Sequence, residues 1–187
     1  MARMPSLRSL RLRWHHADKE ILVAALLVCA VLAGLGFALQ AVFAGKDATR
    51  ERARAAEAQE LACLARNVYF EARGEPVAGQ YAVAEVTMNR KGAERFPDTV
   101  CGVVHEKNWD PIRGRFVGAF SWTEFDVLPE PSGAEWAHAQ KVAVDVYFRR
   151  TTPRLQGATH FHATYITPAW AKEKKPVARI GRHVFYR

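Results

Sequence analysis

The first candidate for chemistry is a carboxyl group in the segment YFEARGE, residues 69–75. Glu71 lies three residues after Val68, at the edge of an apolar stripe and near the predicted end of a helix. A carboxyl group in that position is partly desolvated, and desolvation raises its pKa toward the range of a general acid. The same spacing also fits a solvated glutamate that pairs with Arg73. Glu75 is a second carboxylate, but it equally suits the first turn of the next helix.

Three histidines form the second candidate. His160 and His162 are two residues apart, so both side chains lie on one face of a predicted strand, and His183 lies in the neighbouring predicted strand. Three imidazoles can hold zinc with an open fourth position, which makes a zinc-dependent amidase or peptidase one hypothesis. No HExxH or CxxC motif accompanies these residues, and strand histidines often only hydrogen-bond or stack.

The third candidate is a set of aromatic residues around a serine. Ser121 lacks the flanking glycines of the GxSxG motif, so it is not predicted to be a nucleophile. Phe120, Trp122, Tyr165 and Trp170 are candidates for lining a cleft that stacks against sugar rings. Scattered aromatic residues are also typical of a hydrophobic core, and spacing alone does not separate the two interpretations.

Helices are the main elements that must position these residues. Apolar residues spaced i, i+3, i+4 and i+7 over residues 61–72 continue a polar, Ala- and Arg-rich stretch over residues 47–59. One helix is therefore predicted through both stretches, ended by Gly74 and Pro76. The next helix is predicted over residues 77–90.

Two further helices are predicted from capping residues. Asp98 is the predicted N-cap of a short helix that carries three valines. Ser132 and Glu135 form an S-x-x-E capping box before a helix that is predicted to run to about Arg149.

The C-terminal part changes to a period of two residues. Residues 159–165 and 183–186 alternate in this way, which predicts two short strands in a small β-hairpin. Residues 107–132 contain repeated prolines and glycines without a clean period, and a loop is predicted there. Together these elements predict a mainly helical α+β domain over residues 61–187.

Composition limits the classes of protein. The chain has 187 residues, of which 49% are hydrophobic and 3 are cysteines, so a disordered chain and a disulfide-stapled miniprotein are both excluded. The net charge of +8 includes no dense Lys/Arg run, and no nucleic-acid partner is predicted. A mildly basic surface instead suits phospholipid or an acidic cell-wall polymer.

The N-terminal part predicts a membrane segment. Residues 21–39 (ILVAALLVCAVLAGLGFAL) carry no charge over 19 positions, close to the ~20 residues that cross a bilayer as a helix. We therefore predict a basic cytoplasmic leader over residues 1–20, a single-pass anchor in contact with lipid over 21–43 and a helical stalk over 44–60. The alternative is a cleaved signal peptide, whose apolar region is usually shorter, at ~7–15 residues.

Cysteine usage agrees with export of the folded part. Cys29 lies in the predicted span, which leaves Cys63 and Cys101 outside it. In an oxidising compartment these two can pair, and the disulfide would close a loop of about 40 residues. Two separate buried thiols are the alternative.

Five blocks of the sequence, in order, carry a resemblance to a known family. The chain resembles the cell-wall hydrolase family of the spore-cortex-lytic enzymes (SleB/CwlJ type) over about residues 61–187. This chain differs from the family around the FSW block. Family members often carry extra cysteines there, whereas this chain has Ala119, Glu124 and Phe125. The blocks read LARNVYFEARGEPVAGQYAVAEVTMNR, FPDTVCGVVHEKNW, FSW, GATHFHATYITPAW and RIGRHVFYR.

The resemblance implies a domain like lytic transglycosylases and goose-type lysozymes, which cleaves the MurNAc–GlcNAc bond of peptidoglycan glycan strands. The family's catalytic acid is the first glutamate of EARGE, which is Glu71 here, and no cofactor or metal is implied. A lytic transglycosylase needs only this one carboxyl group, whereas a hydrolytic enzyme needs a second acid, for which Glu75, Glu124 and Asp126 are open candidates.

A membrane span without a cell-wall-binding repeat looks more like a Gram-negative envelope enzyme, so the domain is expected at the bacterial inner membrane, facing the periplasm. A non-catalytic peptidoglycan-binding scaffold is a further alternative. The residues expected to contact substrate are Tyr69, Glu75, Ser121, Trp122, His160, His162 and Tyr165.

Overall fold

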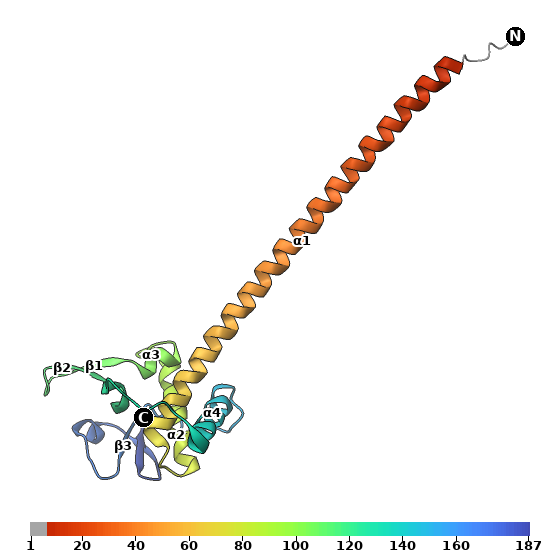
Figure 1. Ribbon diagram of the computed structural model, residues 1–187. Coiled ribbons are helices and arrows are strands. Elements are labelled where there is room, and N and C mark those ends of the chain that lie inside the picture. Colours follow the sequence, from red (N-terminus) through yellow and green to blue (C-terminus); the bar gives the residue numbers. More distant parts are fainter. Residues whose placement is uncertain (1–6) are drawn as a thin grey trace. The chain divides into compact units, whose positions relative to one another are not determined.

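The computed structural model describes residues 7–187, with side chains from residue 19 onward (Figure 1). The predicted basic leader, residues 1–20, therefore lies almost entirely outside the residues whose side chains are described. The chain divides into two compact units, Met1–Ala53 and Arg54–Arg187, and each is considered by itself below.

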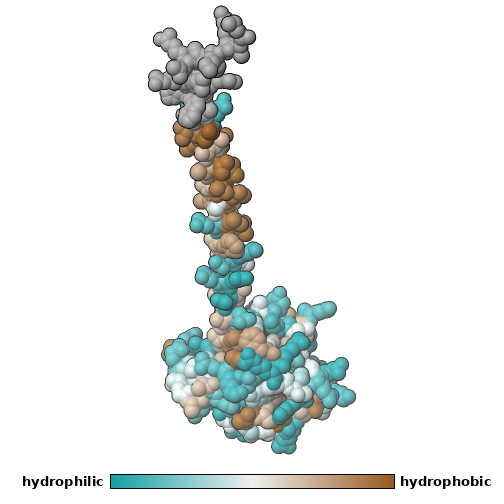
Figure 2. Space-filling view, turned by 90° about the vertical axis from the view of Figure 1, so that its right-hand side faces the viewer, coloured by the Kyte–Doolittle hydropathy of each residue, from teal (hydrophilic) through white to brown (hydrophobic). Residues whose placement is uncertain are grey.

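The first unit is part of a long helix, α1 (Leu7–Ala72). Its apolar side chains from residue 21 to residue 43 are exposed rather than packed against protein, and they form the brown band in Figure 2. Of the described helices, only α1 has the length and apolar composition of a membrane span. A signal sequence near the N-terminus has the same properties.

The second unit contains the last turns of α1, three further α-helices, two 3₁₀ turns and five short strands. The predicted helix end before Gly74 and the predicted helix over residues 77–90 are both present, and the mainly helical α+β class is confirmed. The elements after α1 are α2 (Val77–Lys91), α3 (Val100–Val104), β1 (Lys107–Asp110), β2 (Arg115–Gly118), η1 (Ser121–Glu124), α4 (Gly133–Tyr147), β3 (His160–Ala163), η2 (Ala169–Glu173), β4 (Pro176–Ile180) and β5 (His183–Tyr186).

The core of this unit forms where α1, α2, α3 and α4 meet. Leu64 and Val68 of α1 are fully buried in one cluster with Val103 of α3 and Val142 of α4. A second, smaller cluster joins α2 to the C-terminal sheet through the fully buried ring of Phe185. Helix α2 contributes buried residues to both clusters and so connects the helical core to the sheet.

Two predicted caps differ from the structure. The N-cap of α3 is Thr99 rather than Asp98, because the Thr99 hydroxyl accepts the hydrogen bond from Gly102 N at 3.0 Å. Ser132 is the N-cap of α4, but its side chain makes no capping hydrogen bond, so the predicted box with Glu135 is not formed.

The C-terminal strands form a sheet of three strands rather than a hairpin alone. The predicted pair is present as β3 and β5, which are antiparallel. The structure adds β4, which was predicted to be part of a loop, so the order is β3-β5-β4. In this register His162 pairs with Val184 and Ala163 pairs with His183.

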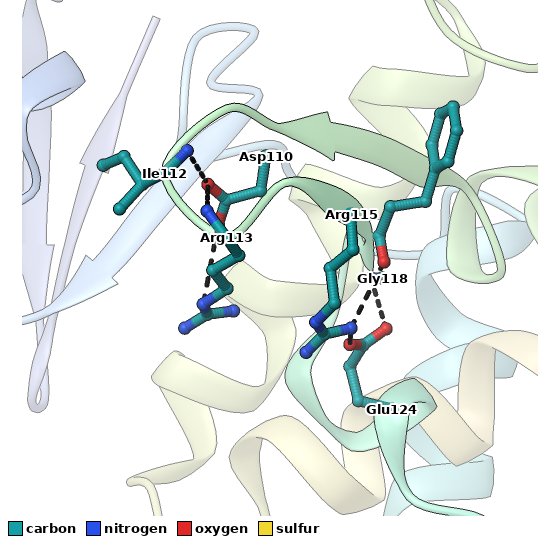
Figure 3. Close-up of polar contacts among 7 residues, drawn as sticks. Asp110, Ile112, Arg113, Arg115, Gly118 and Glu124 are labelled. Atoms are coloured by element: carbon teal, nitrogen blue, oxygen red, sulfur yellow. Dashed lines mark hydrogen bonds and ion pairs between the residues drawn. The ribbon is translucent and has the colours of Figure 1, made fainter.

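Residues 107–118 form a second hairpin, β1–β2, where a loop was predicted. The Asp110 carboxylate accepts hydrogen bonds from Ile112 N and Arg113 N and so stabilises the turn (Figure 3). At the other end of the hairpin, Glu124 accepts from the Gly118 N–H at 2.6 Å and pairs with Arg115. The carboxylates of Asp110 and Glu124 are therefore both hydrogen-bonded within the hairpin and its neighbouring turn.

A disulfide joins the end of α1 to α3. The Sγ atoms of Cys63 and Cys101 are 2.07 Å apart, and the nearby Glu60 carboxylate accepts a hydrogen bond from Val100 N at 2.6 Å. The bridge closes a loop with a sequence separation of 38 residues. It thus restricts the unfolded chain across the segment that leads from α1 through α2 to α3.

Replacing both bridged cysteines, Cys63→Ser with Cys101→Ser, is expected to lower the free energy of unfolding by about 3 kcal/mol, from the loop entropy of the unfolded state. Equilibrium urea unfolding followed by tryptophan fluorescence measures this loss. Cys29→Ser is the matched control and should leave the urea midpoint unchanged. An unchanged midpoint in the double variant would show that the bridge does not stabilise the domain.

Candidate active site

The last turn of α1 positions Glu71. The helix ends there because Gly74 and Pro76 follow, and the Glu75 N–H closes the final turn on the Ala72 carbonyl at 2.9 Å. Ser121, at the start of η1, donates its hydroxyl to Glu71 Oε1 at 3.3 Å. Two segments that are 50 residues apart in the sequence therefore meet at this carboxyl group.

Burial raises the pKa of the Glu71 carboxyl group above its ordinary value. Hydrogen bonds from the Ser121 hydroxyl and from the backbone N–H groups of Ser121 and Trp122 act in the opposite direction, as does the charge of Arg90, without cancelling the rise. The site thus favours the protonated acid before a reaction and offers donors to the carboxylate that forms afterwards.

Arg90 is a functional candidate that the sequence reasoning missed. It is buried on α2, its Nε atom donates to the Thr159 carbonyl at 2.7 Å, and its guanidinium lies 4.9 Å from the Phe120 ring centroid. Desolvation lowers the pKa of Arg90 to about 10, partly opposed by the charges of Glu106 and Glu71. Its spacing in the sequence could have revealed this burial, because Arg90 lies seven residues after Val83 and therefore on the same, buried face of α2.

Asn67 is a second residue that the sequence reasoning missed. It is fully buried on α1, its Oδ1 atom accepts from Trp122 Nε1 at 2.8 Å, and its Nδ2 atom donates to the Thr87 hydroxyl at 3.0 Å. Trp122 itself is only 7% exposed and stacks on Phe70 at 4.9 Å. Because Trp122 follows Ser121 directly, this buried link positions the residue that contacts Glu71.

The predicted sugar-stacking cleft is wrong for two of its aromatic residues. Phe120 and Trp122 lie in the core cluster, so neither ring presents a face to a substrate. Tyr69 is also buried and packs edge-to-face against Trp136, with its hydroxyl accepting from Arg73. Tyr165, in contrast, is 82% exposed and remains available for contact.

Glu75 is engaged inside the fold rather than exposed beside Glu71. The Arg182 backbone N–H and Nε donate to its two carboxylate oxygens at 2.8 and 2.7 Å. Burial alone would raise the pKa of Glu75, but the Arg182 donors and the charges of His183 and Arg182 hold it below its ordinary value. Glu75 thereby ties the start of α2 to the turn between β4 and β5, which is a structural role.

The three histidines do not converge. His183 pairs with Ala163 in the sheet, so its ring lies on the face opposite His162, against Phe161 at 5.1 Å. His162 contacts the Tyr186 hydroxyl with Nε2 and the Ala163 carbonyl with Nδ1, both at 2.9 Å. The ligand set of the zinc hypothesis was therefore wrong, because the strand register separates it.

No group of three or more His, Cys, Asp or Glu side chains within the described part of the chain is arranged to hold a metal ion. Of the residues expected to contact substrate, Ser121 and Trp122 hydrogen-bond to Glu71, Ser121 through its hydroxyl and both through their backbone N–H groups. His160 is half-buried in a separate group of aromatic and basic residues.

A desolvated glutamate that faces hydroxyl and amide donors, in a small α+β domain, is the arrangement of an acid–base enzyme. Residues 74–186 match the cell wall hydrolase family, and the chain belongs to that family. The match confirms the resemblance and the predicted class of enzyme. It begins three residues after Glu71, so the role of Glu71 rests on the geometry above and on the EARGE block.

Curated relatives agree with this family. The chain is 31% identical over 127 residues to the spore cortex-lytic enzyme of Oceanobacillus iheyensis and 29% identical over 126 residues to that of Bacillus subtilis. Each match covers 67% of this chain but only 41% and 37% of those relatives. The chain thus spans about two fifths of the length of the proteins it matches.

Two solved structures share the fold. One is the catalytic domain of the germination-specific lytic transglycosylase SleB from Bacillus anthracis, with a TM-score of 0.51 and 27% identity over 68% of this chain and 93% of that one. The other is the catalytic domain of the Bacillus cereus SleB protein, with the same TM-score and identity over 68% of this chain and 89% of that one.

Proposed function

We propose that this chain is a peptidoglycan glycosidase that cleaves the MurNAc–GlcNAc bond as a lytic transglycosylase, with Glu71 as the acid and then the base. The observation that carries the proposal is the environment of Glu71, a carboxyl group whose pKa is raised by burial while Ser121 donates to it. The lytic transglycosylase activity named for the Bacillus anthracis structure, which shares this fold, supports the reaction type.

In this mechanism Glu71 gives up one proton as an acid and then takes a different proton as a base. The protonated carboxyl group donates to the glycosidic oxygen as the bond to the muramyl carbon breaks, and the GlcNAc end of the strand leaves. The resulting carboxylate then takes the proton of the muramyl C6 hydroxyl, whose oxygen closes a 1,6-anhydro ring. The Ser121 hydroxyl and the two backbone N–H groups stabilise the carboxylate between the steps.

The single-acid route is favoured because two candidate second acids are already occupied. Glu75 is bound by Arg182, and Glu124 is bound by Arg115 and Gly118 N. Neither carboxylate is free to position a water molecule, which a hydrolytic glycosidase requires.

We also propose that residues 21–43 anchor the enzyme in the inner membrane, with the catalytic domain in the periplasm. The uncharged, exposed side chains of this segment suit lipid contact. The disulfide between Cys63 and Cys101 suits an oxidising compartment.

Digestion of purified sacculi by the full chain in detergent, with mass analysis of the products, tests the proposed reaction. We expect 1,6-anhydro-muropeptides from the wild type and none from Glu71→Gln, whereas Glu57→Gln, an exposed helical position, should act like the wild type. Reducing-end muramyl products would show hydrolysis instead, and released stem peptides would show an amidase or peptidase. Sacculi that are bound but left intact by the folded wild type would favour the scaffold alternative.

A further inference from the structure

A group of basic side chains surrounds His160, and we call Arg95, Lys174, His160 and Trp170 the cationic cluster. Arg95 Nη2 lies 3.2 Å from His160 Nε2 and 3.5 Å from the Thr159 hydroxyl. On its other side, His160 faces Trp170, with ring centroids 5.4 Å apart. The cluster is therefore organised by β3 and η2 together with the loop that follows α2.

The positive charge of this cluster is not balanced by protein carboxylates. Among the described residues, neither Arg95 nor Lys174 forms an ion pair. Desolvation and the charges of Lys174, Arg90 and Arg95 together lower the pKa of His160 to about 4. His160 is therefore neutral at physiological pH, and among the described residues the two cations have no carboxylate within ion-pair distance.

Arg95 has donors left for a ligand. Only its Nη2 atom makes a hydrogen bond among the described residues, while its guanidinium carbon lies over the Phe96 ring, 4.5 Å from the ring centroid. A guanidinium presents five N–H groups in a planar fork that matches a carboxylate. The contact with Phe96 restricts the Arg95 side chain, which limits the entropy lost when an anion binds.

The cationic cluster adjoins the site of Glu71 through continuous contacts. Thr159, next to His160, accepts a hydrogen bond from Arg90 at 2.7 Å, and the Arg90 guanidinium lies over Phe120. Phe120 precedes Ser121, whose hydroxyl contacts Glu71. These contacts link the cationic cluster to the segment that carries Ser121, so the cluster belongs to the same part of the domain as Glu71.

We propose that Arg95 and Lys174 bind a carboxylate of the peptide stem on the muramyl residue, so that the enzyme selects glycan that carries peptides. This inference rests on the proposed function, because it adds the part of peptidoglycan that the domain recognises. The stem is an anion attached to the sugar whose bond is cleaved, and its carboxylates match the unpaired charge of the cluster. Arg95 forms the paired hydrogen bonds, and Lys174 adds a second positive charge.

The test compares two forms of glycan strand: intact, peptide-bearing strands and strands stripped of their peptides by an amidase. For the full-length double variant Arg95→Gln with Lys174→Gln, we expect kcat/KM on peptide-bearing strands to fall roughly tenfold, as for the loss of a charge-assisted hydrogen bond. The loss on stripped strands should be much smaller. The matched control is Arg179→Gln with Lys175→Gln, which removes two exposed charges that are not part of the cationic cluster and should behave like the wild type.

Direct binding provides a readout that is independent of turnover. Calorimetry with the Glu71→Gln protein should show tighter binding of a disaccharide-tetrapeptide than of the peptide-free disaccharide, with the preference lost in the double variant. Equal binding of both ligands, or an equal loss of rate on both forms of strand, would overturn the inference while leaving the proposed reaction intact. A different result would assign the cluster to phospholipid instead. In that case the double variant would bind anionic vesicles more weakly than the wild type does, and neither protein would prefer the ligand that carries the peptide stem.

Discussion

Replacing Glu71 by glutamine is expected to lower the rate of peptidoglycan cleavage by about 10³-fold, the usual scale for loss of a general acid. Glutamine keeps the shape of the side chain and an oxygen that accepts from Ser121, so the local contacts survive. What it lacks is the proton that must reach the leaving oxygen. Release of soluble muropeptides from sacculi, measured at equal amounts of folded protein, gives the rate.

The pH dependence of the wild type follows from the same group. Because burial raises the pKa of Glu71, the acid stays protonated at pH values where an exposed glutamate is ionised. The cleavage rate should therefore hold at mildly acidic pH and fall as pH rises through the pKa of folded Glu71. If the Glu71→Gln protein keeps the wild-type rate, the general acid must be another carboxyl group.

The stability of the same variant separates a catalytic loss from misfolding. Below the unfolded-state pKa both states hold the proton, and the ionisation of Glu71 does not affect the free energy of unfolding. Above it the unfolded chain ionises more easily than the folded one, so Glu71 disfavours folding at neutral pH. Glu71→Gln should thus raise the melting temperature at pH 7 and leave it nearly unchanged at pH 4.

Glu75 provides the contrasting case. Its pKa is lowered in the folded state, so its contribution to stability is present above the unfolded pKa and disappears as pH falls through the folded pKa. Glu75→Gln should therefore lower the melting temperature at pH 7. The two glutamates of EARGE thus have opposite effects on stability, although they are only four residues apart.

The helices of the domain were predictable because their signals are local. The apolar period and the Gly74 and Pro76 breaks are contained in a few consecutive residues, and α1 and α2 end and begin where these signals place them. The site was predictable only in part. The EARGE block singled out Glu71, but the apolar stripe alone did not distinguish a half-buried acid from a solvated one.

The rest of the site depends on contacts between distant segments. Strand β4 forms because β5 pairs with it, and the register that turns His183 away from His162 is set by strand pairing rather than by the alternation of either strand. The burial of Trp122 likewise depends on Asn67, which lies 55 residues earlier. An aromatic residue beside a serine gives no sign of such a partner in the sequence.

Replacing Asn67 by leucine is expected to lower the free energy of unfolding by about 3 kcal/mol, because a buried donor left without a partner costs ~1–3 kcal/mol and packing is disturbed as well. The Trp122 Nε1–H group has no other acceptor among the described residues. The Thr87 hydroxyl keeps its own bond to the Val83 carbonyl, so the main unpaired group is the indole. Urea unfolding measures the loss.

A double-mutant cycle with Trp122→Phe isolates this link. Phenylalanine retains the stack on Phe70 but has no N–H group, so Asn67→Leu with Trp122→Phe leaves no unpaired donor or acceptor between the two positions. We therefore expect the double variant to be clearly more stable than the sum of the single losses predicts, and additive losses would contradict the link.

Kinetics then separate positioning from simple stability. If Asn67 acts on catalysis through Trp122 and Ser121, folded Asn67→Leu should show a reduced kcat with little change in KM, because the donor to Glu71 loses its fixed place while the substrate surface is kept. A purely structural role would reduce only the fraction of folded protein, and kcat per folded molecule would equal that of the wild type.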